Sequence, residues 1–352
     1  MKRVFFTLAL FLGGLQLFTS CACAGKAQVT MTPVTLDQTY FSGILEYITE
    51  DGRISPRRMP ENLMGFDKYM KSCSAGIRIL LETDSPRLKL EQMFYKRDSV
   101  DFTGTTSVVV DHGVPVTFNA PAPPHEKGGD TFAFEMELPG DGLMHRVEIW
   151  LPFGRRTAIT GLYLAENARV KPAAPEEKTI LFLGDSITQG FFGQGIRTWA
   201  SLFAHSRKAN LVNLGIGGAT MPPEKDIQSA SDAVKRDITF LAFGVNDCSR
   251  KRQPEEFRKD AADALAILTK KGPVVVMTPL HSPLKIRQGL GESLEQFRQI
   301  LREEAKRYDN VTVVEGTELL PCDDKYFGDG LHPTPEGMQY IFESLKTKVP
   351  AF

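Results

Sequence analysis

The stretch LFLGDSITQG, residues 181–190, places an apolar run directly before Gly184, Asp185 and Ser186. An apolar run that ends in a polar turn is typical of a buried strand. The serine is either a nucleophile or part of an ordinary polar turn, and Gly-Asp-Ser alone does not separate the two readings. The distinction depends on whether a base, an acid and oxyanion donors follow further along the chain.

The region around this stretch, residues 179–352, alternates short apolar runs with helical stretches. Continuous apolar strands separated by helices indicate a parallel sheet that is covered on both faces. We therefore predict an α/β domain of three layers, flavodoxin-like, with a five-stranded parallel sheet. The expected strands are 179–183, 211–214, 238–243, 274–277 and 311–314, and the expected helices lie near 198–207, 225–236, 254–271, 292–308 and 335–347.

Residues 25–170 have a different pattern of short strands broken by turns. TFAFEMEL, residues 131–138, and RVEIWLP, residues 146–152, both alternate apolar with polar side chains. Alternation of this kind predicts an antiparallel β-sandwich in which each sheet has one solvent-exposed face. Residues 171–178, KPAAPEEK, are charged and contain prolines, which indicates a linker between two domains.

The N-terminal segment has the pattern of a secretory signal over residues 1–24: a basic start, an apolar run over 4–18 and small residues after it. Two processing patterns compete. ACA at 22–24 fits ordinary cleavage, whereas FTSC at 18–21 resembles a bacterial lipobox whose Cys21 would carry a lipid. Under both patterns we expect an exported bacterial protein, either secreted or a periplasmic or outer-surface lipoprotein.

The charge pattern excludes some classes of partner. The formal net charge is −1, and acidic and basic residues are interspersed. Without a basic stripe or a basic amphipathic helix, we expect no nucleic acid, and membrane contact only through the N-terminal lipid anchor. The expected ligand is a small molecule or a neutral polymer.

Cysteine usage and motif spacing argue against a metal or a cofactor. Beyond the signal only Cys73, Cys248 and Cys322 remain, with no C-x-x-C pair. We expect three buried thiols, with one disulfide as the alternative in an oxidising compartment. Tightly spaced metal ligands, a dinucleotide fingerprint and a P-loop are all missing from the sequence, which implies no cofactor and no metal.

Polar clusters follow the ends of the predicted strands. Ser186 follows the first strand, Gly218 lies in NLGIGG after the second, Asn246 lies in GVND after the third, and DGLH at 329–332 precedes the last helix. In open α/β sheets, ligands bind beyond the carboxyl ends of the strands. We therefore expect these four clusters to converge on one crevice. The α/β-hydrolase elbow G-x-S-x-G is excluded, because residue 188 is threonine.

Taken together, these clusters resemble the SGNH, or GDSL, hydrolase family. The resemblance implies that Ser186 is the nucleophile, that His332 is its general base and that Asp329 orients the histidine. It also implies an oxyanion hole made of the Ser186 N–H, the Gly218 N–H and the side-chain amide of Asn246.

Two further comparisons with this family concern the kind of substrate that the protein would accept. Residues 57–85 look like the jelly-roll-type domain found ahead of some SGNH carbohydrate esterases. The family's second block often reads Gly-x-Ser-Gly-Asp, but here Gly217 and Ala219 replace the serine and the aspartate. This departure bears on substrate choice more than on catalysis.

The chemistry independently explains these residue types. A serine hydroxyl is a poor nucleophile until an imidazole takes its proton, and the other imidazole nitrogen must be held. His332 precedes Pro333, and Thr334 with Pro335 predicts a capped helix start, which places the histidine on a fixed loop. His281 is the other histidine that could act as the base in place of His332. We also consider it as a residue that contacts the substrate.

The sequence thus predicts an exported serine esterase that removes short acyl groups, chiefly acetyl, from carbohydrate through an acyl-enzyme. A lipase, lysophospholipase or thioesterase of the same family is one alternative, and an inert glycan-binding surface lipoprotein is another. Trp150, Phe153 and Tyr163 are candidates to stack on a sugar, with core packing as their competing role.

Overall fold

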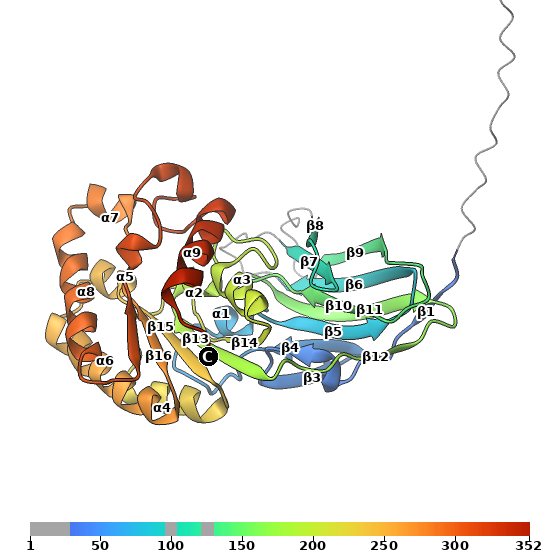
Figure 1. Cartoon of the computed structure of the whole chain (residues 1–352), viewed down its shortest axis with the longest axis horizontal. Helices are drawn as coiled ribbons and strands as arrows, with labels where there is room; N and C mark the ends of the chain where they lie inside the picture. The colour runs from blue at the N-terminus through green and yellow to red at the C-terminus, as the bar shows by residue number, and fades with distance from the viewer. Residues whose placement is uncertain (1–28, 96–103, 121–129) are drawn as a thin grey trace, which may run out of the picture.

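The computed structural model describes residues 29–95, 104–120 and 130–352. The predicted signal segment, with Cys21, lies outside these residues. A β-sandwich forms one end of the molecule and a parallel-sheet α/β part forms the other (Figure 1). The predicted combination of an antiparallel sandwich and a flavodoxin-like domain is confirmed.

The sandwich consists of two antiparallel six-stranded sheets that share one apolar core. The alternation read in TFAFEMEL is borne out, because Phe134 and Leu138 are buried while Glu135 and Glu137 are exposed. The first sheet has the order β3 (Glu46–Glu50), β4 (Arg53–Arg57), β11 (Arg156–Ala165), β6 (Arg87–Tyr95) and β9 (Asp130–Glu137), with β1 (Met31–Pro33) paired to β11. The second has the order β12 (Val170–Pro172), β5 (Arg78–Thr83), β10 (His145–Trp150), β7 (Thr105–Val110) and β8 (Val116–Asn119), with β2 (Phe41–Ser42) paired to β5.

Strand β12 overlaps the predicted linker. Lys171 and Pro172 pair with β5, so sandwich pairing runs into the start of segment 171–178. The α/β part begins with β13 at Lys178. The division into domains at 171–178 stays a prediction.

The α/β part is built on a parallel five-stranded sheet with strand order 2-1-3-4-5. Its strands, in spatial order, are β14 (Ala209–Asn213), β13 (Lys178–Gly184), β15 (Ile238–Ala242), β16 (Val274–Met277) and β17 (Val311–Val314). β13 and β15 are almost wholly buried, as their apolar sequences require. The switch between β14, β13 and β15 is where such sheets open a crevice.

Helices of the α/β part form two groups. α3 (Trp199–Ser206) packs with α9 (Pro335–Lys348), while α4 (Glu224–Ala233), α6 (Pro254–Leu268) and α8 (Gly291–Ala305) pack in series (Figure 1). The sequence periodicity did not reveal four shorter helices: α1 (Lys68–Ser72), which precedes the α/β part, and α2 (Ser186–Gln189), α5 (Val245–Ser249) and α7 (Pro283–Arg287) within it. Single turns of 3-10 helix lie at Gln38–Tyr40, Thr269–Lys271, Gly316–Glu318 and Asp324–Tyr326. None of the helices in the described ranges has the length and apolar character that a bilayer span requires.

A fully buried arginine joins the two parts. Arg58 follows β4 and donates from Nη1 to the carbonyls of Asn213 and Gly215, at 2.7 Å each. Its other donors reach the carbonyls of Cys73, at 2.9 Å, and Met70, at 2.5 Å. Burial lowers the pKa of Arg58 to about 10, so the guanidinium is still charged at neutral pH. One side chain of the N-terminal part therefore holds the loop that follows β14.

Replacing Arg58 with methionine tests this link. Arg58→Met removes the donor from four buried carbonyls, each of which costs about 1–3 kcal/mol when unpaired. We expect the free energy of unfolding to fall by at least about 3 kcal/mol, measured by urea denaturation. The control is Arg87→Met, because the side chain of Arg87 makes a long ion pair with Glu137, 3.8 Å apart, worth less than about 1 kcal/mol, as its one ion pair among the described residues. Equal effects of the two changes would contradict the assignment.

Candidate active site

The nucleophile candidate lies at the carboxyl end of β13. Ser186 is the first residue of α2, and the Asp185 carboxylate caps this helix by accepting the N–H of Ile187 at 2.9 Å. The strand must pass close to the helix, since a Cβ on Gly184 would lie 2.1 Å from Oγ1 of Thr188. The sharp strand-to-helix turn thus requires glycine and presents Ser186 at the edge of the sheet.

Ser186, His332 and Asp329 form a continuous chain of hydrogen bonds. The Oγ of Ser186 lies 2.8 Å from Nε2 of His332, and Nδ1 of His332 lies 2.7 Å from Oδ2 of Asp329. The serine is 4% exposed. With the proton on Nδ1, the imidazole presents an unprotonated Nε2 to the serine hydroxyl, which is the arrangement that a general base needs.

The loop that carries the acid and the base is held by its own backbone. Oδ1 of Asp329 accepts the N–H groups of Leu331 and His332, at 2.9 and 2.8 Å. Partial burial alone would raise the pKa of Asp329, but the hydrogen bonds from the His332 side chain and backbone outweigh burial and hold it well below its usual range. The carboxylate is therefore ionised across the neutral range. As predicted, Thr334 caps α9 and Pro335 is its first residue.

The predicted oxyanion donors follow the ends of three neighbouring strands: Ser186 after β13, Gly218 on the loop after β14, and Asn246 in α5 after β15. Gly218 has a φ of +77°, a conformation that favours glycine. The N–H groups of Ser186 and Gly218 have no acceptor among the described residues, which leaves both free to bind an oxyanion. Asn246 donates one amide hydrogen to the carbonyl of Ala219 at 2.9 Å, and its second amide hydrogen remains.

Two residues that sequence reasoning missed hold this loop. Oε1 of the buried Gln189 accepts the N–H of Gly217 at 2.7 Å, which ties the loop to the helix of the nucleophile. Nη2 of Arg250 donates to the carbonyl of Gly218 at 2.7 Å. Gln189 lies in the quoted stretch, but its partner becomes visible only when the strand ends meet.

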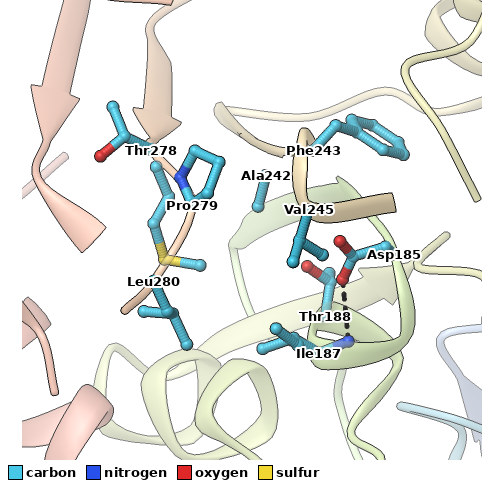
Figure 2. A pocket seen from close by; sticks show the side chains of 10 residues that line it. Asp185, Ile187, Thr188, Ala242, Phe243, Val245, Thr278, Pro279 and Leu280 are labelled. Carbon is cyan, nitrogen blue, oxygen red and sulfur yellow. Dashed lines mark hydrogen bonds between the residues drawn. The ribbon is translucent and has the colours of Figure 1, made fainter. Parts of the chain in front are cut away.

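A small cavity lies behind the nucleophile turn (Figure 2). Its volume is about 20 Å³, and its polar lining is Asp185, Thr188 and Thr278, beside apolar side chains at and just after the ends of β15 and β16. This volume suits one water molecule and excludes an acyl chain. Burial raises the pKa of Asp185 to about 7, against the hydrogen bond from Ile187. The cavity therefore lies within the side chains that support the nucleophile turn.

The face of His332 is covered by two aromatic rings from the loop after α2. Phe191 stacks on the imidazole with a centroid distance of 5.1 Å, and Phe192 lies at 5.9 Å. Phe192 is 45% exposed and has a φ of +63°, unusual for a bulky residue. Its ring rests on Gly328, where a Cβ would come within 2.8 Å of the ring. An exposed aromatic surface therefore borders the candidate base.

Of the other residues named from the sequence, Phe153 packs against Phe191 with ring centroids 6.0 Å apart, and no described contact links Trp150, Tyr163 or His281 to Ser186 or His332. Trp150 and Phe153 are buried, and Tyr163 is half-buried with its hydroxyl on Glu91, 3.2 Å away. His281, the rival base, has no hydrogen bond with Ser186 among the described contacts, whereas His332 has one.

The thiol expectation is partly wrong. Cys73, Cys248 and Cys322 all remain thiols that form no disulfide in the described residues, but only Cys73 and Cys248 are buried. Cys322 is exposed in the loop between β17 and α9, two residues after the buried Leu320.

Comparison with known proteins agrees with the strand-end clusters. Residues 182–340 match the GDSL-like lipase/acylhydrolase family, a range that includes every residue of the candidate site. This part of the chain therefore has the pattern of a GDSL-like lipase/acylhydrolase domain. A GDSL esterase/lipase of Arabidopsis thaliana is 28% identical over 207 residues, which are 47% of this chain and 83% of the relative. The GDSL domain makes this chain a carboxylic ester hydrolase.

Solved structures share the fold of both parts. The salicylyl-acyltransferase SsfX3 of a tetracycline biosynthetic pathway covers 91% of this chain and 96% of its own, with 19% identity and a TM-score of 0.77. A family two carbohydrate esterase of Cellvibrio japonicus covers 91% of this chain and 97% of its own, with 14% identity and a TM-score of 0.62. The sandwich ahead of the GDSL domain is thus a shared architecture.

Gln189 offers a test of the loop geometry. Gln189→Met removes the acceptor of the Gly217 N–H and should loosen the neighbouring Gly218 donor. We expect kcat for 4-nitrophenyl acetate to fall about 10-fold, equivalent to about 1.4 kcal/mol of barrier, with KM within about 2-fold. Gln189→Glu keeps an oxygen acceptor and should retain more of kcat. A change in KM alone, or equal losses in both variants, would exclude this positioning role.

Proposed function

We propose that this chain is an exported serine esterase that removes short acyl groups, chiefly acetyl, from carbohydrate. The observation that carries the catalytic part is the hydrogen-bonded chain from Ser186 through His332 to Asp329. A serine, an imidazole and an ionised carboxylate in this order are the parts that acyl transfer requires.

In the first half of the reaction, the Oγ of Ser186 attacks the carbonyl carbon of the ester. Nε2 of His332 takes the serine proton, and the Asp329 carboxylate stabilises the imidazolium that forms. The negative charge on the carbonyl oxygen is bound by the N–H groups of Ser186 and Gly218 and by the amide of Asn246. One such donor is typically worth ~3–4 kcal/mol of barrier.

In the second half, the tetrahedral intermediate collapses. His332 returns the proton to the leaving sugar oxygen, so the alcohol departs and an acyl-serine remains. Water then attacks the acyl carbon while His332 takes a proton from it, and the same donors bind the second oxyanion. Ser186 recovers its proton as the carboxylic acid leaves, which completes a balanced hydrolysis.

Three observations support a sugar ester over a lipid ester. The structure shares its two-part layout with a family two carbohydrate esterase. The exposed ring of Phe192 next to His332 offers a flat apolar surface of the kind on which a pyranose ring packs. The signal pattern at the N-terminus supports export, where polysaccharides are found, either as a secreted protein or as a lipoprotein anchored through Cys21.

The alternatives make different use of the same residues. A lipase, lysophospholipase or thioesterase would keep the reaction and change the acyl group. An inert glycan-binding lipoprotein would have no use for a nucleophile, a base and free oxyanion donors that are all in reach of one another.

Release of acetate tests the proposal. We expect the full chain to release acetate from one or more O-acetylated polysaccharides of a panel, and Ser186→Ala to lose at least about 1,000-fold in rate. Acetate is quantified directly, and 4-nitrophenyl acetate is compared with the octanoate. A preference for octanoate would favour the lipase alternative, and equal rates for wild type and Ser186→Ala would favour the binding protein.

Phe192 tests where the sugar lies. Phe192→Ala should raise KM for an acetylated oligosaccharide by about 2- to 10-fold, as expected for about 0.5–1.5 kcal/mol of stacking. Hydrolysis of 4-nitrophenyl acetate should stay within about 2-fold, since its alcohol is not a sugar. Phe192→Trp, which keeps an aromatic face, serves as the matched control. If Phe192→Ala leaves both substrates unchanged, the sugar does not contact this ring.

A further inference from the structure

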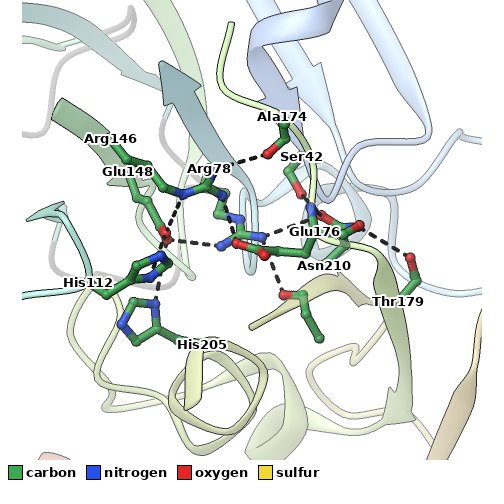
Figure 3. A network of polar contacts seen from close by, with 11 residues as sticks. Ser42, Arg78, His112, Arg146, Glu148, Ala174, Glu176, Thr179, His205 and Asn210 are labelled. Atoms are coloured by element: carbon green, nitrogen blue, oxygen red, sulfur yellow. Dashed lines mark hydrogen bonds and ion pairs between the residues drawn. The ribbon is translucent and has the colours of Figure 1, made fainter. Parts of the chain in front are cut away.

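A second polar cluster lies where the sandwich meets the α/β part (Figure 3). His112 follows strand β7, Glu148 lies in β10, and His205 lies near the end of α3. Nδ1 of His112 is 3.6 Å from Oε1 of Glu148, and Nδ1 of His205 is 3.6 Å from Oε2. The two imidazoles thus approach the same carboxylate, one from each part of the molecule.

We propose that His112, Glu148 and His205 form a binding site for a transition-metal dication, with Zn²⁺ as the best fit. Within the described residues, this is the group of three histidine or acid ligands whose ligand atoms all lie within 4.8 Å of one another. Bonds of about 2.0–2.2 Å in a tetrahedral site put neighbouring ligand atoms roughly 3.3 Å apart. The two 3.6 Å spacings are close to this value, so small side-chain rotations complete the site.

The carboxylate is ionised and keeps free lone pairs. Two guanidinium groups contact the carboxylate of Glu148, and their positive charge keeps it ionised despite its burial. Arg78 donates to Oε2 at 2.9 Å and Arg146 to Oε1 at 3.3 Å, which uses one lone pair of each oxygen. Arg146 is also paired with Glu176 at 2.7 Å. One lone pair on each Glu148 oxygen remains for an ion.

The solvent exposure of the three side chains and the chemistry of their ligand atoms indicate which metal ions the site could bind. Glu148 is 1% exposed, whereas the side chains of His112 and His205 are 36% and 19% exposed. An ion would thus be reached from solvent over the imidazoles and would keep an open position for water or an anion. Imidazole ligands favour zinc, copper and nickel, while magnesium and calcium prefer oxygen ligands. The neighbouring guanidiniums weaken the affinity for any cation.

The proposed ion would connect the two parts of the molecule. His112 and Glu148 come from the sandwich and His205 from α3, so binding should favour the docked arrangement of the two parts. The sequence predicts no metal, because ligands on three separate elements have no common spacing. None of the three residues belongs to the candidate active site.

The test uses the full chain after chelator treatment, with zinc chloride as the probe. We expect one zinc per chain by equilibrium dialysis with elemental analysis, and a rise of Tm of at least about 2 °C. His112→Ala and His205→Ala should each lower the zinc affinity at least about 10-fold and abolish the Tm shift. These variants leave the Arg78–Glu148 ion pair in place, so folding is preserved better than in a Glu148 variant.

His145→Ala is the matched control, because His145 contacts two carboxylates, at 2.5 and 2.8 Å, but no second imidazole. It should bind zinc like the wild type. The proposal is overturned if zinc does not bind, if only His145→Ala loses it, or if magnesium raises Tm as much as zinc does. Hydrolysis of 4-nitrophenyl acetate by His205→Ala should match the wild type, so this result is independent of the proposed function.

Discussion

The candidate active site depends on a buried cation in the segment that leads from the sandwich. Arg58 holds the carbonyls of Asn213 and Gly215, which stand at the end of β14 directly before the loop of Gly218. A charge that is removed from water is tolerated only when its donors are satisfied, and Arg58 meets this condition with carbonyls from both parts. The segment that follows β4 thus helps to fix the start of the loop that carries Gly218.

Polar groups around Asp329 and Gly217 are satisfied by hydrogen bonds in the same way. Asp329 is satisfied by the backbone and the side chain of His332, and the Gly217 N–H is satisfied by Gln189. Among the described residues, the backbone N–H groups of Ser186 and Gly218 have no protein acceptor, and these are the groups beside which the proposed acyl transfer would develop negative charge. The candidate site thus combines a hydrogen-bonded acid and loop with two N–H groups that are available to a ligand.

The parallel sheet and the residues of the candidate site could be predicted from the sequence, because each leaves a pattern in a short stretch of residues. Continuous apolar strands indicated the parallel sheet, and each strand end carried its own polar motif, so Ser186 and His332 could be named before their contact was known. Gln189 and Arg58 could not, because their partners are backbone atoms of distant loops, and backbone atoms leave no signature in a sequence. Phe192 was missed for a related reason. Only the fold shows that its ring is exposed while Trp150 and Phe153 are covered.

The contact between the Phe192 ring and Gly328 has a consequence for how related proteins can diverge. The ring comes from the loop after α2, but its position is set by a residue that lacks a side chain on the loop of Asp329 and His332. A mutation that adds even one methyl group at Gly328 would push the ring away without touching the serine, the histidine or the acid. Relatives could therefore diverge in the alcohols they accept through this one neighbour, with the reaction chemistry left intact.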